Sequence, residues 1–355
     1  MIEYTMVPEE YLPLAQVQST EEGELLTKQN VVGVALGTKW SNGVDTGDKA
    51  ITVLVDTKMP LDMLHEEDRV PASFGDTPTD VQEVGVLQAG RALTAPVENG
   101  AAHAVLDEPQ LQAPLLRPGD LAREQAGPFA LAKRFRPAYG GLSVGHFKIT
   151  AGTIATAVYD ASAFPGKPQA YYILSNNHVL ANSNNAAIGD PILQPGPFDG
   201  GALTADVIAR LSRFVPIKFR QPGQPVPLNF VDAAIAQGQF NDLDRQIFWI
   251  GYLRGVNSSP TIGMTVQKTG RTTNWTTGQI RNINATVDVN YGNGQVARFA
   301  QQLLTTDISA GGDSGSLVAD LGANAVGLLF AGSPVVTVLN RIALVQALLG
   351  IRVYP

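Results

Sequence analysis

The sequence predicts a mainly β protein that ends in a helix, because of its composition and its apolar pattern. Only 16% of the 355 residues are charged, and 36 glycines and 23 prolines supply many turns. From residue 141 onward, short apolar runs such as 170–174 and 325–330 alternate with Gly, Pro and Asn. This spacing is typical of an all-β barrel or sandwich. Helical periodicity is clear only over residues 335–349.

Composition divides the chain into four predicted parts. Residues 1–29 are expected to be a loosely ordered acidic lead, and residues 96–140 a Pro-rich linker. Between them, residues 30–95 form a predicted small α+β domain, and residues 141–355 form the main β domain. The elements expected in the small domain are strands at 31–36, 50–55 and 80–86 and a short helix at 61–67.

The charge distribution favours some partners over others. The net charge is −7, with −11 on residues 1–100 and +4 on residues 101–355. This balance argues against nucleic-acid binding by the whole chain. The acidic and basic parts either dock on each other or form two separate solvated surfaces.

Several function classes are excluded by what the sequence lacks. There is no cysteine, which excludes disulfides, Cys-ligated zinc, iron–sulfur clusters and thiol nucleophiles. The histidines have no second ligand at metal-binding spacing, so we expect neither a metal nor a cofactor. No apolar run reaches about 18 residues and the N-terminus does not resemble a secretory signal, so we expect no membrane association and a cytoplasmic location.

The strongest local motif is residues 311–317, Gly-Gly-Asp-Ser-Gly-Ser-Leu. Its glycines permit a sharp turn that exposes Ser314 and leaves N–H groups free to face a developing oxyanion. A serine hydroxyl needs an adjacent base to act as a nucleophile. His178 directly follows the apolar run 171–174 and is a candidate for that base, while Asp232 interrupts another apolar run. A carboxylate in such a run needs a partner, and a histidine tautomer is a suitable one.

The chain order His178, Asp232, Ser314 is that of the chymotrypsin template. Residues 141–355 resemble the trypsin/chymotrypsin-like (S1-type) serine peptidases, and within them the bacterial α-lytic protease and HtrA protease domains. A second matching segment is Lys-Thr-Gly-Arg-Thr-Thr-Asn-Trp at 268–275, in which Asn274 replaces the usual glycine. The resemblance implies a double β-barrel with the active site between the barrels.

The resemblance also implies roles for individual residues. His178 would be the general base, Asp232 its orienter and Ser314 the nucleophile, with the N–H groups of Gly312 and Ser314 as the oxyanion hole. Arg271 would pair with Asp313 to order the oxyanion loop without zymogen cleavage. The remaining implied residues bind substrate, and they are Ile308 and Ser309 at the floor of the specificity pocket and Phe330, Ala331 and Gly332 in the edge strand. With no carboxylate at that floor, a small or neutral residue before the scissile bond is expected.

The whole chain is also distantly similar to the plant narrow-leaf proteases, which favours a homo-oligomer. Two functions follow from these patterns. The first is a serine endopeptidase that forms an acyl-enzyme on Ser314 from a polypeptide substrate. The second is a catalytically silent, protease-like module that binds peptides or serves as a scaffold.

Overall fold

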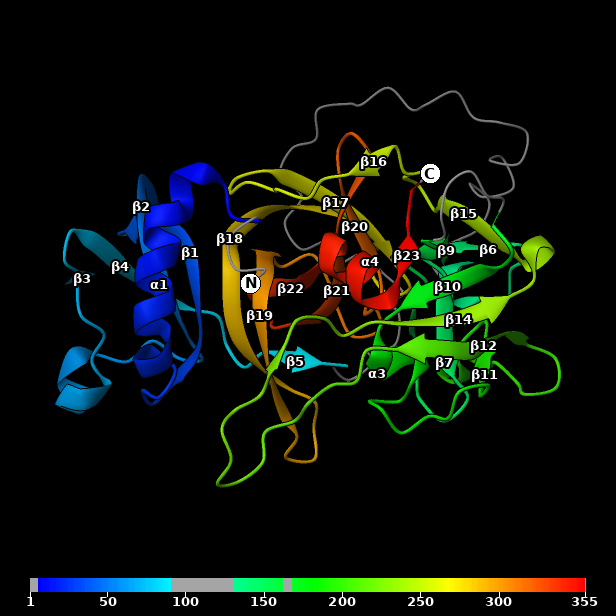
Figure 1. Ribbon diagram of the computed structural model, residues 1–355, viewed down its shortest axis with the longest axis horizontal. Coiled ribbons are helices and arrows are strands. Elements are labelled where there is room, and N and C mark those ends of the chain that lie inside the picture. Colours follow the sequence, from blue (N-terminus) through cyan, green and yellow to red (C-terminus); the bar gives the residue numbers. More distant parts are fainter. Residues whose placement is uncertain (1–5, 91–129, 162–167, 355) are drawn as a thin grey trace.

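Two curled sheets dominate the computed structural model, which describes residues 6–90, 130–161 and 168–354 (Figure 1). The fold is mainly β, a chymotrypsin-like double β-barrel with a C-terminal helix, as the sequence predicts. The proposed domain boundaries stay predictions. Residues 1–5 of the acidic lead and 96–129 of the Pro-rich linker lie outside the described residues.

The first barrel is an eight-stranded sheet in the order β23-β9-β10-β14-β12-β11-β7-β8. The sheet closes into a barrel because β8 runs almost directly into β9. Between these two strands, the Ile154 amide donates to the Leu142 carbonyl at 2.9 Å. The strands are β7 Ser143–His146, β8 Gly152–Thr153, β9 Thr156–Asp160, β10 Tyr171–Ser175, β11 Pro191–Leu193, β12 Val207–Phe214, β14 Ala234–Gly238 and β23 Ile351–Arg352.

The second barrel is a closed ring of six strands in the order β17-β18-β19-β22-β21-β20. These strands are β17 Thr265–Gly270, β18 Asn274–Asn290, β19 Val296–Thr306, β20 Leu317–Asp320, β21 Asn324–Gly332 and β22 Val336–Arg341. Shorter strands flank the barrels, namely β13 Leu228–Asn229, β16 Gly255–Val256 and the pair β6 Ala138–Gly140 with β15 Leu243–Ile247. Closure makes each barrel a rigid scaffold for the loops that connect its strands.

The N-terminal region extends the sheet of the second barrel. Its β1 Val31–Ser41 pairs antiparallel with β18, and β2 Val44–Val55, β4 Thr77–Glu83 and β3 Ser73–Phe74 continue outward. The three expected strands are thus present, but they do not form a sheet of their own. Val34 and Leu36 of β1 and Ile51 and Val53 of β2 are buried in one apolar cluster with residues of the second barrel.

The expected loose order of residues 1–29 is wrong for the 14 residues Leu12–Leu25, which form α1. Its sequence has a weak apolar stripe, so periodicity does not reveal it. The helix is held instead by Gln18, which is buried. The Gln18 Nε2 donates to the Asn284 carbonyl at 2.9 Å, and the Asn284 side-chain amide donates back to Gln18 Oε1 at 3.0 Å.

Two further helical expectations differ from the structure. Residues 61–67 form two short 3₁₀ turns, Leu61–Met63 and Glu66–Asp68, because their apolar side chains have no surface to pack on and remain exposed. Within 335–349, only α4 Ile342–Leu349 is helical, since the preceding residues complete the second barrel as β22. No helix in the described part of the chain is long and apolar enough to cross a membrane.

After β4 the chain leaves the outer strands and crosses to the barrel junction. There β5 Gln88–Ala89 pairs with β18 and with β21 (Figure 1). The remaining short elements are α3 Asn177–Leu180 and the 3₁₀ turns Glu9–Tyr11, Ala130–Ala132, Pro197–Asp199 and Phe240–Asp242.

Replacing Gln18 with Ala tests how α1 is held. The substitution leaves the half-buried carbonyl and side-chain amide of Asn284 without this partner, so the free energy of unfolding should fall by about 1–3 kcal/mol. Gln16→Ala, at an exposed position of the same helix, is the matched control and should change it by less than about 0.5 kcal/mol. Denaturant titration measures both, and equal effects would contradict the role given to Gln18.

Candidate active site

His178 and Asp232 are joined by two hydrogen bonds at the junction of the barrels. His178 lies on α3, the single turn that follows β10, and Asp232 lies just before β14. The ring Nδ1 is 2.6 Å from Asp232 Oδ2, and the backbone N–H of His178 donates to Oδ1 at 3.2 Å. The Asp232 side chain is fully buried. The carboxylate therefore fixes the ring orientation and favours the tautomer with its proton on Nδ1.

Tyr291 is a further partner of Asp232 that the sequence analysis missed. It lies in the turn between β18 and β19, and its hydroxyl donates to Asp232 Oδ2 at 2.7 Å. Burial, and then the negative charge of Asp232, raise the pKa of Tyr291 well above its ordinary value. The phenol is consequently a permanent donor. No local motif marks Tyr291, because its role depends on a contact across 59 positions.

The backbone of Asp232 is held by amide side chains from each barrel. Asn340 of β22 accepts a hydrogen bond from the Asp232 N–H at 2.9 Å. Asn176, just before α3, donates to the Asp232 carbonyl at 2.8 Å. Asp232 is thus positioned by groups from both barrels, so its orientation depends on how the two are docked.

Ser314 lines the same cavity as His178, with Gly312 and Tyr291 on its wall. The imidazole Nε2 of His178 is buried and has no hydrogen-bond partner among the described residues. A buried imidazole nitrogen without a hydrogen bond costs free energy, and a catalytic role is one explanation for such a nitrogen. Here it is a base with a free lone pair in a cavity lined by a serine.

The predicted oxyanion loop borders this cavity, which Gly312 and Ser314 line. Gly312 and Gly315 have positive φ values of 97° and 95°, which allow the sharp turn. The carbonyl of Gly311 accepts from the Thr272 hydroxyl at 2.6 Å, and the Asp313 carbonyl accepts within the turn. Because N–H and C=O point in opposite directions across a trans peptide, the following N–H groups, those of Gly312 and Ser314, face away from these donors.

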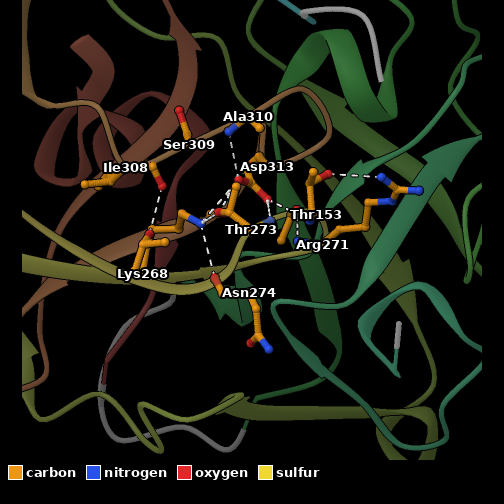
Figure 2. A network of polar contacts seen from close by, with 12 residues as sticks. Thr153, Lys268, Arg271, Thr273, Asn274, Ile308, Ser309, Ala310 and Asp313 are labelled. Atoms are coloured by element: carbon orange, nitrogen blue, oxygen red, sulfur yellow. Dashed lines mark hydrogen bonds and ion pairs between the residues drawn. The ribbon is translucent and has the colours of Figure 1, made fainter. Parts of the chain in front are cut away.

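The expected Arg271–Asp313 ion pair is wrong, because Lys268 takes that place (Figure 2). Lys268 Nζ lies 3.2 Å from Asp313 Oδ2, and both side chains are fully buried. Asp313 also accepts from the backbone N–H of Thr272 at 2.8 Å and from the Thr273 hydroxyl at 2.6 Å. Burial lowers the pKa of Lys268, against the opposing effect of Asp313. The oxyanion loop is therefore anchored by a buried cation without a new N-terminus.

Arg271 instead forms a two-point ion pair with Asp199 of the first barrel. Its Nε donates to Asp199 Oδ2 at 2.8 Å, and Nη2 contacts the other carboxylate oxygen. Its backbone N–H donates to the Thr153 hydroxyl, which itself donates to the Gly312 carbonyl at 2.8 Å. Arg271 thus links the two barrels through Asp199, and its backbone supports the oxyanion loop indirectly, through Thr153.

The residues expected to bind substrate have different surroundings. Ile308 packs into the hydrophobic core of the second barrel, so its side chain does not form a pocket floor. Ser309 Oγ lies 2.8 Å from the Thr337 hydroxyl. Phe330 is fully buried, while Ala331 and Gly332 pair with β5, where a substrate strand was expected.

A second histidine–carboxylate pair shows which feature distinguishes His178. His146 is buried in the first barrel, with Nε2 3.0 Å from Asp190 Oδ2 and Nδ1 accepting from the Lys148 N–H. Both of its nitrogens are occupied, so it is a structural contact. The described residues contain no group of three or more potential ligands that could hold a metal ion.

Searches of protein-family models and of curated proteins give no match. Among solved structures, the chain is similar to Thermobifida fusca protease A, with 16% identity, a TM-score of 0.41, and coverage of 60% of this chain and 96% of that one. It is also similar to Nocardiopsis protease, with 17% identity, a TM-score of 0.39, and coverage of 61% and 98%. A third similar structure is Cellulomonas bogoriensis chymotrypsin, with 16% identity, a TM-score of 0.39, and coverage of 60% of this chain and 96% of that one. These neighbours are chymotrypsin-like bacterial serine proteases.

Replacing Lys268 with Met tests the anchor of the oxyanion loop. It leaves the buried Asp313 carboxylate without its cation, so the free energy of unfolding should fall by about 3–5 kcal/mol. The double variant Lys268→Met, Asp313→Asn removes both charges and should recover part of this loss. A double-mutant cycle by denaturant unfolding measures the coupling, and strictly additive effects would show that the pair does not act as a unit.

Proposed function

We propose that this protein is a serine endopeptidase. The observation that supports it most is the free Nε2 of His178, on a ring fixed by Asp232, in a cavity that Ser314 lines. A base, its orienter and a hydroxyl in one cavity are the parts needed for acyl transfer.

In the proposed mechanism, His178 Nε2 removes the proton of Ser314 as Oγ attacks the carbonyl carbon of the peptide bond. Asp232 stabilises the imidazolium that forms. The N–H groups of Gly312 and Ser314 stabilise the oxyanion of the tetrahedral intermediate. The imidazolium then protonates the leaving amine, and the acyl-enzyme is hydrolysed by water that His178 activates in the same way.

The alternative function is a catalytically silent module that binds a peptide or serves as a scaffold. One observation favours it, namely that β5 already pairs with Ala331 and Gly332. The retention of a complete triad together with its oxyanion loop supports the enzyme more strongly, since a binding groove needs neither. A polypeptide partner, a homo-oligomer and a cytoplasmic location stay predictions.

Hydrolysis of a fluorescein-labelled unfolded protein tests the proposal. Ser314→Ala and His178→Ala should each reduce the rate by about 10³-fold or more, because the triad members act as a unit. His65→Ala, at an exposed position remote in sequence from the triad, should leave it unchanged. Hydrolysis that survives in Ser314→Ala would assign the activity to another group and contradict the proposal.

Tyr291→Phe tests the extra donor on Asp232. Losing a hydrogen bond to a charged carboxylate costs about 1.5–3 kcal/mol, so kcat/KM should fall by about tenfold or more. Tyr252→Phe, at a half-exposed tyrosine, is the control and should have no effect. A wild-type kcat/KM in Tyr291→Phe would show that the other contacts of Asp232 keep it in position without the phenol.

A further inference from the structure

The segment that follows β4 reaches the candidate active site. β5 is far in sequence from the catalytic residues, yet it lies beside α3, which carries His178 (Figure 1). Ala89 and Gly90 line the same cavity as His178 and Ser314. A Cβ atom placed on Gly90 would lie 3.7 Å from His178 Cδ2. The chain therefore places its own backbone against the catalytic base.

β5 occupies the edge of β21 that was expected to bind substrate. The pairing is antiparallel, with Ala331 opposite Ala89 and Gly332 opposite Gln88. Continuing this register by one residue sets Gly90 opposite Phe330. An added antiparallel strand is how an extended peptide binds an exposed sheet edge. The segment thus lies as a bound peptide would, with its C-terminal end toward the catalytic serine.

The other edge of β5 is held as well. The Asn290 N–H at the end of β18 donates to the Leu87 carbonyl at 2.9 Å, so the polar backbone groups of Leu87 face β18. Successive residues of a strand direct these groups to opposite sides. Those of Gln88 consequently face β21, which agrees with its pairing to Gly332. The segment lies in a slot with a strand on each side.

Side-chain burial shows which positions the slot recognises. Leu87 is 1% exposed and belongs to the apolar cluster that includes Phe330, whereas the neighbouring Val86 is 48% exposed. Ala89 is 7% exposed. Gly90 has a φ of 61°, which a larger residue would adopt only with strain. The slot therefore fits a large apolar residue at position 87 and a small residue at position 89. Position 88 accepts any residue, and position 90 requires glycine.

We infer that residues 87–90 are an intramolecular ligand of the active site, so that the protein as folded blocks its own substrate strand. A substrate must displace this segment before it can pair with β21. The slot then recognises extended peptides of the same chemistry, with a large apolar residue two positions before a small one. The kinetic part of this inference rests on the proposed peptidase function, whereas the occupancy of the slot does not.

Leu87→Ser tests the inference in the full chain, and Val86→Ser is the matched control on the same segment. Losing the buried leucine should weaken the segment's hold on the slot and raise the rate of peptide hydrolysis by about tenfold. Val86→Ser should leave the rate unchanged. A synthetic peptide of residues 84–90, added to Leu87→Ser, should reduce the rate again, whereas a scrambled peptide should not.

Hydrogen exchange in variants that also carry Ser314→Ala measures whether β5 occupies the slot, because these variants cannot form an acyl-enzyme. The amides of residues 330–332 should exchange faster in Leu87→Ser than in Val86→Ser, and the synthetic peptide should restore protection. Equal exchange and equal hydrolysis in the two variants would overturn the inference. Faster exchange in Leu87→Ser with no hydrolysis in any variant that retains Ser314 would uphold the intramolecular ligand and reject the peptidase.

Discussion

The buried carboxylate of Asp232 is the constraint on which the rest of the site depends. A charge removed from water costs several kcal/mol unless it is fully hydrogen-bonded. Here the donors come from separate parts of the chain, with His178 on a turn after β10 and Tyr291 in the β18–β19 turn. Asn340 of β22 fixes the backbone of Asp232. The carboxylate is satisfied only when the two barrels are docked, so folding of each barrel and assembly of the site are coupled.

The oxyanion loop follows the same principle with a different pair of charges. Asp313 and Lys268 are both fully buried, and each compensates the other where a free charge would be costly. This pair anchors the loop from within the second barrel. The edge of β21 is occupied by β5, which links the N-terminal region to the catalytic cavity. The contacts that hold β5 are separate from the His178–Asp232 hydrogen bonds, so the proposed catalytic residues and an occupied peptide slot are compatible.

Sequence patterns predicted the barrels, and they singled out His178, Asp232 and Ser314, because these features leave local signals. Apolar runs between glycines indicated the strands, and the glycines around Ser314 indicated the sharp turn. Residues that act through long-range contacts could not be predicted in this way. Tyr291 and Gln18 stand in ordinary local sequence, and only tertiary contacts give them a role. The partner of Asp313 was misassigned because Lys268 and Arg271 lie three positions apart on a segment whose end turns from one barrel toward the other.

Reaction with a fluorophosphonate, followed by mass mapping of the modified peptides, is the most direct test of an activated Ser314. The two barrels, the buried Asp232 and the free Nε2 of His178 together predict a covalent adduct on Ser314 and on no other serine. The adduct should form in the unmodified chain and more quickly once β5 is loosened. Failure to modify Ser314 even with β5 displaced would contradict the assembled triad and favour a protein that only binds peptides.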